Sequence, residues 1–162
     1  MVRRKEAQIS SLVYVVLATV LFCLRVPNDS IGMAAGTPWY THFTYSFFHV
    51  GVLHLIVNCW ALLCVVFTYD INVRMLLTAF LVAASFPASL FPSAVVTIGA
   101  SGFIYALFGR ISLSVIRKWY FQGWTAFFIG IGFLFPGTNA WLHLWCYLLG
   151  LALAFLNKPL SR

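Results

Sequence analysis

Charged residues are scarce in this sequence, and acidic residues are scarcer still. Of its 162 residues, 8% are charged and three are aspartate or glutamate, while 62% are hydrophobic. A soluble domain of this size carries roughly a quarter charged residues, which help to cover its surface. The apolar residues also occur in long blocks rather than in the amphipathic stripes of helices that pack in water. The composition therefore argues against a water-soluble globule and predicts a membrane protein.

Two further classes of protein lack the patterns that they would need. The ten basic residues give a net charge of +7 but form no patch with interleaved aromatic residues, so no nucleic-acid partner is predicted. They lie between apolar blocks, where membrane proteins place their cytoplasmic anchors. The cysteines lie within apolar stretches without metal-ligand spacing. We interpret them as packing residues and predict no metal or other cofactor; they are Cys23, Cys59, Cys64 and Cys146.

Six apolar segments are candidates for crossing a membrane, whose hydrocarbon core of about 30 Å takes about 20 helical residues. They are predicted at residues 10–24, 47–69, 72–90, 98–116, 121–135 and 139–156. Residues 26–46 form the one long connection. We therefore predict a single all-α, polytopic domain over residues 1–162. The first segment lacks a small-residue cleavage site, so we interpret it as a span rather than a signal peptide.

The basic residues predict the orientation of these spans. With six spans, both termini share one side with the connections that follow the second and fourth spans. The opposite side holds Arg25, and Arg110 lies within the fourth segment. The positive-inside rule therefore places both termini in the cytoplasm. A signal anchor with five spans in another register remains an alternative, but it would break this asymmetry. The basic residues on the predicted inner side are Arg3, Arg4, Lys5, Arg74, Arg117, Lys118, Lys158 and Arg162.

Polar residues within apolar spans are expensive and usually face the interior of the bundle. The second span holds His54 and Asn58, which are four residues apart and so share one helical face. The fourth span opens near Ser101 and the sixth near His143. All three spans begin on the predicted outer side. These four residues are therefore expected at one depth, just beneath the outer surface. His49, also in the second segment, is interpreted as closer to structural.

These residues have a coherent chemistry. A serine hydroxyl becomes a nucleophile when a neighbouring histidine takes its proton. The oxyanion that follows needs donors, for which the Asn58 amide, the His54 imidazole and the Ser101 backbone N–H are candidates. No acidic residue is placed to complete a triad, so a Ser101–His143 dyad is predicted. A GxSG sequence alone, or one intramembrane histidine alone, is often a packing feature. Their shared depth favours a catalytic site.

The sequence resembles the rhomboid intramembrane serine proteases. The matching stretches are HVGVLHLIVN from His49, GASGFIYALFG from Gly99, and His143 near the start of the last span. The resemblance implies the six-helix rhomboid fold, with Ser101 as nucleophile, His143 as base, and His54 with Asn58 as the oxyanion hole. It further implies that Tyr105 stacks on the catalytic histidine. Supporting positions under this resemblance are His49, Gly99 and Gly102, with Gly102, Ala106 and Gly109 allowing close helix packing.

The resemblance has two departures. The family often has Trp-Arg in the first outer loop, where this chain has Trp39 followed by Tyr40. The last helix of the family usually has a glycine where this chain has Cys146, although Cys146, Gly150 and Ala154 still form a stripe of small residues. Neither departure touches a predicted catalytic residue.

The predicted function is the cleavage of single-span membrane proteins within the lipid bilayer, near its outer face and through an acyl-enzyme. The substrate is expected to reach Ser101 between the second and fifth spans. A bacterial inner membrane is the expected location. Two alternatives stay open: a catalytically silent rhomboid-like protein that binds and escorts membrane proteins, and, with less support, a small transporter. Against the transporter, no acidic residue lies within a span to couple ions.

Overall fold

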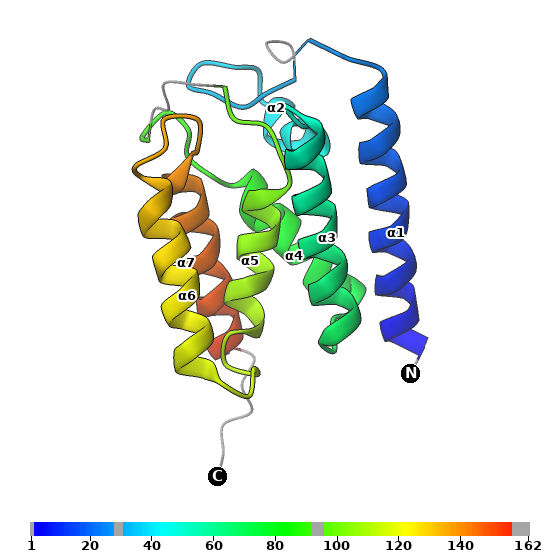
Figure 1. Ribbon diagram of the computed structural model, residues 1–162, viewed down its shortest axis with the longest axis vertical. Helices are drawn as coiled ribbons and strands as arrows, with labels where there is room; N and C mark the ends of the chain where they lie inside the picture. The colour runs from blue at the N-terminus through cyan, green and yellow to red at the C-terminus, as the bar shows by residue number, and fades with distance from the viewer. Residues whose placement is uncertain (1, 28–30, 92–95, 157–162) are drawn as a thin grey trace.

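A computed structural model of the protein describes residues 2–27, 31–91 and 96–156 (Figure 1). Within these ranges the chain is helical and has no strand, so the predicted all-α class is confirmed there. An antiparallel bridge between Met33 and Thr97 joins two loops. The described elements are α1 (Val2–Cys23), α2 (Thr41–Thr44), the 3-10 helix η2 (Tyr45–Phe47), α3 (Val52–Thr68), α4 (Val73–Ala84), α5 (Ser101–Ile111), α6 (Lys118–Gly132) and α7 (Ala140–Leu156).

Each of the six predicted segments overlaps one described helix, but the helix bounds differ from the prediction. Helix α1 begins eight residues earlier than expected, at Val2 rather than Ser10. Helices α3, α4 and α5 are shorter than the segments 47–69, 72–90 and 98–116. Helix α6 is shifted by three residues toward the N-terminus relative to 121–135, and α7 nearly coincides with 139–156.

Local chemistry explains where the shortened helices begin and end. Helix α4 starts after Asn72, whose side chain accepts a hydrogen bond from the Met75 backbone N–H at 3.1 Å. It ends at Ala84 because Pro87 disfavours helical geometry at the residue before it. Helix α3 begins only after Gly51, which is extended. Helix α5 begins after Gly99, whose φ of 123° lies in the region that favours glycine.

One described helix is by itself long and apolar enough to cross a bilayer. This is α1, whose segment Arg4–Cys23 has 20 residues and a mean hydropathy of 1.7. Residues Thr41–Phe47 and Val52–Thr68 would qualify together, but they are bent by 96°. Helices α4 and α7 are apolar and shorter, with 12 and 17 residues. At a rise of about 1.5 Å per residue, 17 residues span about 25 Å, so α7 is shorter than a hydrocarbon core of about 30 Å.

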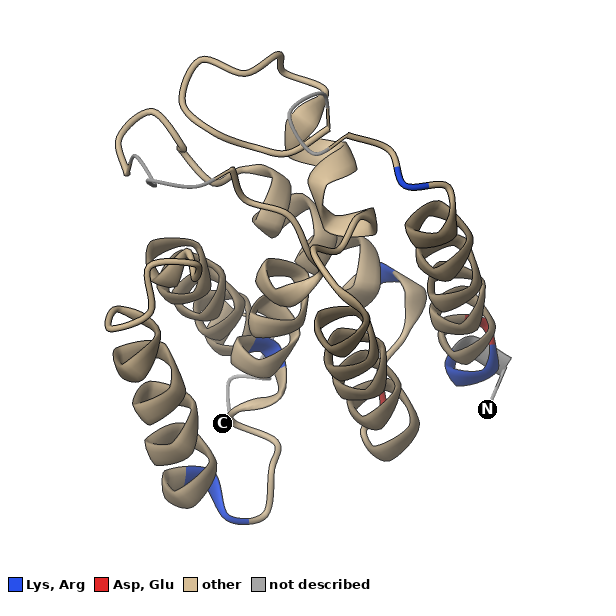
Figure 2. Ribbon diagram, turned by 45° about the horizontal axis from the view of Figure 1, so that its top comes forward, with Lys and Arg blue, Asp and Glu red and all other residues tan. Residues whose placement is uncertain are grey.

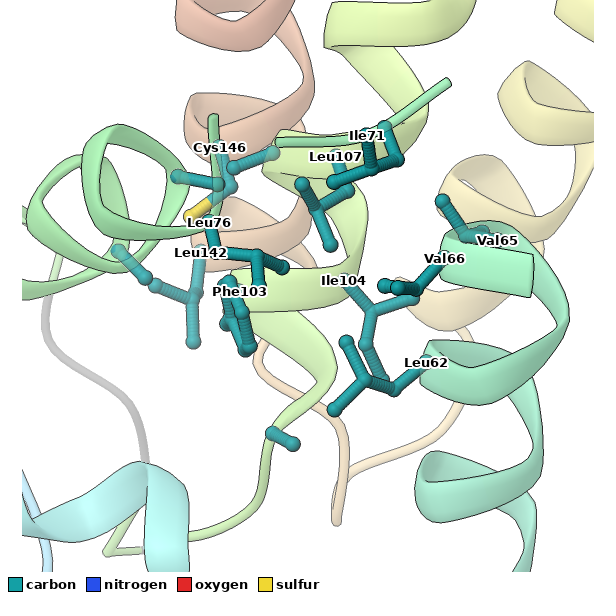
Figure 3. Close-up of a cluster of buried hydrophobic side chains, with 14 of the residues drawn as sticks. Leu62, Val65, Val66, Ile71, Leu76, Phe103, Ile104, Leu107, Leu142 and Cys146 are labelled. Carbon is teal, nitrogen blue, oxygen red and sulfur yellow. The ribbon is translucent and has the colours of Figure 1, made fainter. Parts of the chain in front are cut away.

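Helix α5 lies at the centre of the bundle, in contact with α3, α4 and α7 (Figure 1). Helix α1 packs against α3 and α4, and α6 packs against α7. Apolar side chains from the central helices converge in a buried core (Figure 3). That core includes Leu62 and Val66 of α3, Leu76 of α4, Phe103, Ile104 and Leu107 of α5, and Leu142 and Cys146 of α7.

Large apolar side chains also cover the outward faces of the bundle. Val13 on α1, Trp60 on α3 and Phe128 on α6 are each more than half exposed. Monomeric soluble proteins rarely expose contiguous apolar surface on this scale. These faces suit contact with lipid acyl chains.

The bundle has one basic end. The N-terminal end of α1 and the C-terminal end of α7 lie there together (Figure 1), and Figure 2 shows basic residues near it. Arg4 donates a hydrogen bond to the Phe67 carbonyl oxygen near the end of α3, at 2.7 Å, and Arg110 donates to the Leu153 carbonyl near the end of α7. Because the last carbonyls of a helix have no partner within it, both arginines satisfy and electrostatically stabilise a helix end.

The opposite end is closed by the loop that contains α2 and η2. The Tyr14 hydroxyl of α1 donates to the Ser46 carbonyl, and His42 Nδ1 lies 2.9 Å from the Ala84 carbonyl oxygen at the end of α4. The loop is thereby attached on both sides. Trp39 is 77% exposed, and Tyr40 follows it where the rhomboid resemblance would imply an arginine. Exposed aromatic rings of this kind are typical of a membrane interface.

Candidate active site

A cavity of about 350 Å³ lies toward the end of the bundle that the α2 loop closes. Its walls come from α3, α5 and α7 and from the loops that precede α5 and α7. The four residues predicted to share one depth, Ser101, His143, His54 and Asn58, all line this cavity. They stand within the first two turns of three different helices, which begin at the same end of the bundle.

Ser101 and His143 are in direct contact. Ser101 is the first residue of α5 and His143 the fourth residue of α7. The Ser101 Oγ and His143 Nε2 atoms are 2.8 Å apart, and His143 is 9% exposed. When the hydroxyl donates, Nε2 is the acceptor and the ring carries its proton on Nδ1. This is the geometry in which a histidine takes the proton of a serine nucleophile.

The plane of the His143 ring is fixed by Tyr105. The two rings are stacked, with centroids 4.3 Å apart and planes inclined by 21°. Tyr105 is one turn beyond Ser101 on α5, so a single helix carries both the hydroxyl and the ring against which the imidazole rests. Ring stacking restricts rotation of the imidazole and so keeps Nε2 directed at Ser101.

His54 and Asn58 stand one turn apart on α3, facing the cavity. The Asn58 Nδ2 atom donates to the His54 carbonyl oxygen at 2.8 Å. An amide nitrogen has two hydrogens, so one remains for a ligand in the cavity. The His54 ring packs against Gly99, where a Cβ atom would lie 2.5 Å from His54 Cε1. Gly99 is therefore required both by its backbone conformation and by the space that the imidazole occupies.

Glycines also allow α5 and α7 to approach each other closely. A Cβ atom at Gly109 would collide with the Tyr147 carbonyl oxygen, and one at Gly150 would collide with the Ala106 carbonyl oxygen. Because both obstacles are backbone atoms, a larger residue would push the helices apart. Gly102 is close to the Tyr45 hydroxyl, which would lie 2.9 Å from an added Cβ. Cys146 is fully buried, so its bulk lies within the core.

His49 lies elsewhere than the second predicted span suggested. It precedes α3 rather than lying within it, because the chain between η2 and Gly51 is not helical. The residue is 6% exposed and does not line the cavity described above. Its ring packs edge-on against His54 with centroids 5.2 Å apart. His49 thus contacts the cavity residue His54 without reaching the cavity itself.

A family model described as a Rhomboid domain matches residues 36–159. The chain belongs to the rhomboid family. The predicted family is thereby confirmed, and membership makes the chain an integral membrane protein, in agreement with its apolar composition and outward faces. A search of curated proteins finds no match. The rhomboid family includes inactive members, so activity has to be argued from the residues of the cavity.

Three residues around this rhomboid site were not predicted from the sequence. Tyr45 accepts a hydrogen bond from the Gly99 N–H through its carbonyl oxygen at 2.9 Å. Asn139 Nδ2 donates to Thr97 Oγ1 at 2.9 Å. An asparagine immediately before an apolar helix is a recognisable N-cap signal, so Asn139 was within reach of sequence reasoning. Tyr45 and Thr97 carry no such local signal, because their partners are distant in the chain.

Proposed function

We propose that this rhomboid-family protein is an intramembrane serine endopeptidase that cleaves membrane proteins near the outer face of the bilayer. The observation that carries the proposal is the distance of 2.8 Å between Ser101 Oγ and His143 Nε2 in a cavity. Nothing in a packing role requires a hydroxyl and an imidazole to meet within hydrogen-bond reach at a cavity wall. A nucleophile and its base require it.

The reaction proceeds through an acyl-enzyme. Ser101 Oγ attacks the carbonyl carbon of the scissile peptide bond while His143 Nε2 takes the hydroxyl proton. The tetrahedral intermediate collapses, the C–N bond breaks, and His143 gives the proton to the departing amine. Water then attacks the ester with His143 again as base, which releases the carboxylic acid and restores Ser101.

The negatively charged oxygen of the tetrahedral intermediate needs hydrogen-bond donors close to it. Asn58 has an amide hydrogen beyond the one that it gives to the His54 carbonyl. His54 adds its imidazole, and the backbone N–H of Ser101 belongs to the first turn of α5, where N–H groups lack partners within the helix. The positive end of the α5 dipole points the same way. Donors held in place before the reaction stabilise the developing charge most effectively.

The substrate in this proposal is a single transmembrane segment that reaches Ser101 from the side, between α3 and α6. Val57 and Ala61 of α3 line the cavity, and α6 exposes Phe127 and Phe128 outward. The resemblance to the rhomboid proteases implies a preference for small residues at the cleavage point. The resemblance and the short loops favour a bacterial inner membrane with both termini in the cytoplasm.

The silent-escort alternative receives less support. Catalytically silent relatives typically lose the serine or the histidine, whereas this chain has both in contact. The transporter alternative is disfavoured because, in the part of the chain that the structure describes, the acidic residues lie away from the cavity. Glu6 lies in the first turns of α1 and Asp70 just beyond α3, both at the basic end of the bundle.

A labelling and cleavage experiment tests the proposal. The purified protein is treated with a fluorophosphonate serine probe in detergent, and its cleavage of a transmembrane substrate is followed in proteoliposomes. We expect labelling and cleavage in the wild type and the loss of both in Ser101→Ala and His143→Ala. Ser112→Ala is the control, because it removes a buried hydroxyl at the far end of α5. Absence of labelling and cleavage in a folded wild type would contradict the proposal.

A further inference from the structure

The side chain of Asn139 forms the N-cap of the helix that carries His143. Its Oδ1 atom accepts a hydrogen bond from the Leu142 N–H at 3.0 Å, and its carbonyl oxygen accepts one from the His143 N–H at 3.3 Å. An asparagine in this position satisfies N–H groups that have no partner inside the helix. Asn139 therefore determines how the first turn of α7 begins.

The other end of the same amide reaches the segment that precedes Ser101. Asn139 Nδ2 lies 2.9 Å from Thr97 Oγ1. Because Oδ1 already accepts a backbone N–H, the orientation of the amide is settled, and Nδ2 can only donate. The hydroxyl of Thr97 is the acceptor. The side chain of Asn139 thus joins the first turn of α7 to the loop segment that leads into α5.

Thr97 is itself held on its opposite side by the α2 loop. Its N–H and carbonyl pair with those of Met33, each at 2.9 Å. Two residues later, the Gly99 N–H donates to the Tyr45 carbonyl oxygen, also at 2.9 Å. The segment before Ser101 therefore lies between two supports, the α2 loop on one side and Asn139 on the other. Thr97 and Asn139 both line the cavity.

We infer that Asn139 and Thr97 are positioning residues that set the separation of Ser101 Oγ and His143 Nε2. The inference rests on the proposed protease function. Helices α5 and α7 are in close backbone contact at Ala106, Gly109 and Gly150, one to two turns deeper than the dyad. The outer ends of these two helices need a second point of attachment beyond that contact. The Asn139–Thr97 hydrogen bond supplies it.

The reaction is sensitive to such an attachment. Proton transfer from a hydroxyl to a base needs the two heavy atoms within about 2.6–3.2 Å. A displacement of about 1 Å costs on the order of 100-fold in rate. Binding of a substrate segment depends instead on the apolar walls of the cavity. Thr97 and Asn139 are only two of the residues that line it. Loss of the bond should therefore lower kcat far more than it raises KM.

Three variants separate this role from a general loss of stability. Thr97→Val preserves the shape and removes the acceptor, whereas Thr97→Ser keeps the hydroxyl. Asn139→Ser keeps an N-cap residue that is too short to reach Thr97. We expect Thr97→Val and Asn139→Ser to lose about 10-fold or more in kcat and in the rate of fluorophosphonate labelling, with KM changed by about 2-fold or less. Thr97→Ser should restore most of the turnover.

Ser112→Ala serves as the matched control, since its hydroxyl is fully buried and donates to the Gly109 carbonyl away from the cavity. Thermal unfolding is measured for every variant. Wild-type kcat in Thr97→Val and Asn139→Ser would overturn the inference, and so would a loss no larger than that of an equally destabilised Ser112→Ala, or a Thr97→Ser variant without rescue. A folded wild type that neither labels nor cleaves would overturn the protease proposal itself, and this inference with it.

Discussion

Ser101 and His143 are 42 positions apart in the chain, and each depends on neighbours that have no chemical step of their own. Tyr105 holds the imidazole plane by stacking, and Gly99 leaves room for the His54 ring. Removing either neighbour would change the direction of a functional group without deleting it. At the scale of single residues, the proposed chemistry therefore depends on the orientation of the functional side chains as much as on their residue types.

Asn58 offers the sharpest residue-scale prediction. Its amide has one hydrogen bound to the His54 carbonyl and one left for the oxyanion. Because a donor of this kind acts mainly in the transition state, Asn58→Ala should lower kcat by about 10²–10³-fold with little change in KM. The measurement is steady-state cleavage of a transmembrane substrate in proteoliposomes.

Asn72→Ala is the control for that experiment. Asn72 caps α4 through the Met75 N–H at 3.1 Å and does not line the cavity. Its loss should cost about 1 kcal/mol of stability and leave kcat of the folded protein unchanged. Equal kcat in Asn58→Ala and the wild type would rule out an oxyanion role for Asn58.

At the scale of helices, the contact between α5 and α7 decides whether the dyad can form, because each helix carries one of its members. Gly150→Ala should push the two backbones apart, since the added Cβ would collide with the Ala106 carbonyl oxygen. We expect a loss of about 1–3 kcal/mol in stability, together with slower labelling of Ser101. Thermal unfolding in detergent and the rate of fluorophosphonate labelling measure the two effects.

Gly130→Ala on α6 is the matched control. An added Cβ there has no atom within 4 Å, so alanine should raise stability slightly through its better helix propensity. Replacing glycine by alanine is thus expected to lower the stability at Gly150 and to raise it slightly at Gly130. A Gly150→Ala variant as stable as the wild type would contradict close packing at this point.

The six described helices that overlap the predicted segments were predictable because each lies in an apolar block, but their ends depend on smaller signals. Asn72 and Pro87 mark the limits of α4, and the predicted segment nevertheless extended to residue 90. The dyad stood out because polar residues are rare in apolar helices. The hydrogen bond between Asn139 and Thr97 could not be predicted in this way, because it joins two loops 42 residues apart and produces no periodic pattern in the sequence. Long-range contacts between loops are therefore the part of the site that sequence reasoning missed.

At the scale of the molecule, most of the described basic residues lie at the end opposite the cavity, with Arg25 as the exception. Arg4 and Arg110 stabilise helix ends on one side, and α6, which begins at Lys118 after Arg117, starts on that side (Figure 1). The cavity lies toward the other end, near the beginnings of α3, α5 and α7. The positive-inside rule predicts that the basic end faces the cytoplasm. The proposed cleavage would then take place near the outer face.

Single cysteines placed at the two ends test this orientation. Ala35→Cys lies in an exposed part of the α2 loop, and Ser114→Cys lies in an exposed turn between α5 and α6. The exposed native cysteines, Cys23 and Cys64, are first replaced by alanine. In intact cells a membrane-impermeant maleimide should label Ala35→Cys. It should label Ser114→Cys only after the membrane is permeabilised.

The background with Cys23 and Cys64 replaced is the control for this labelling, because its remaining cysteines are buried. The opposite pattern would place the cavity on the cytoplasmic side, where the substrates would have to be cut near their inner ends. Labelling of both positions in intact cells would contradict a bundle that separates two compartments. Among the helices that the structure describes, α1 alone has the length of a full span. The orientation of the shorter helices therefore depends on the bundle as a unit, and these two positions report on it from either end.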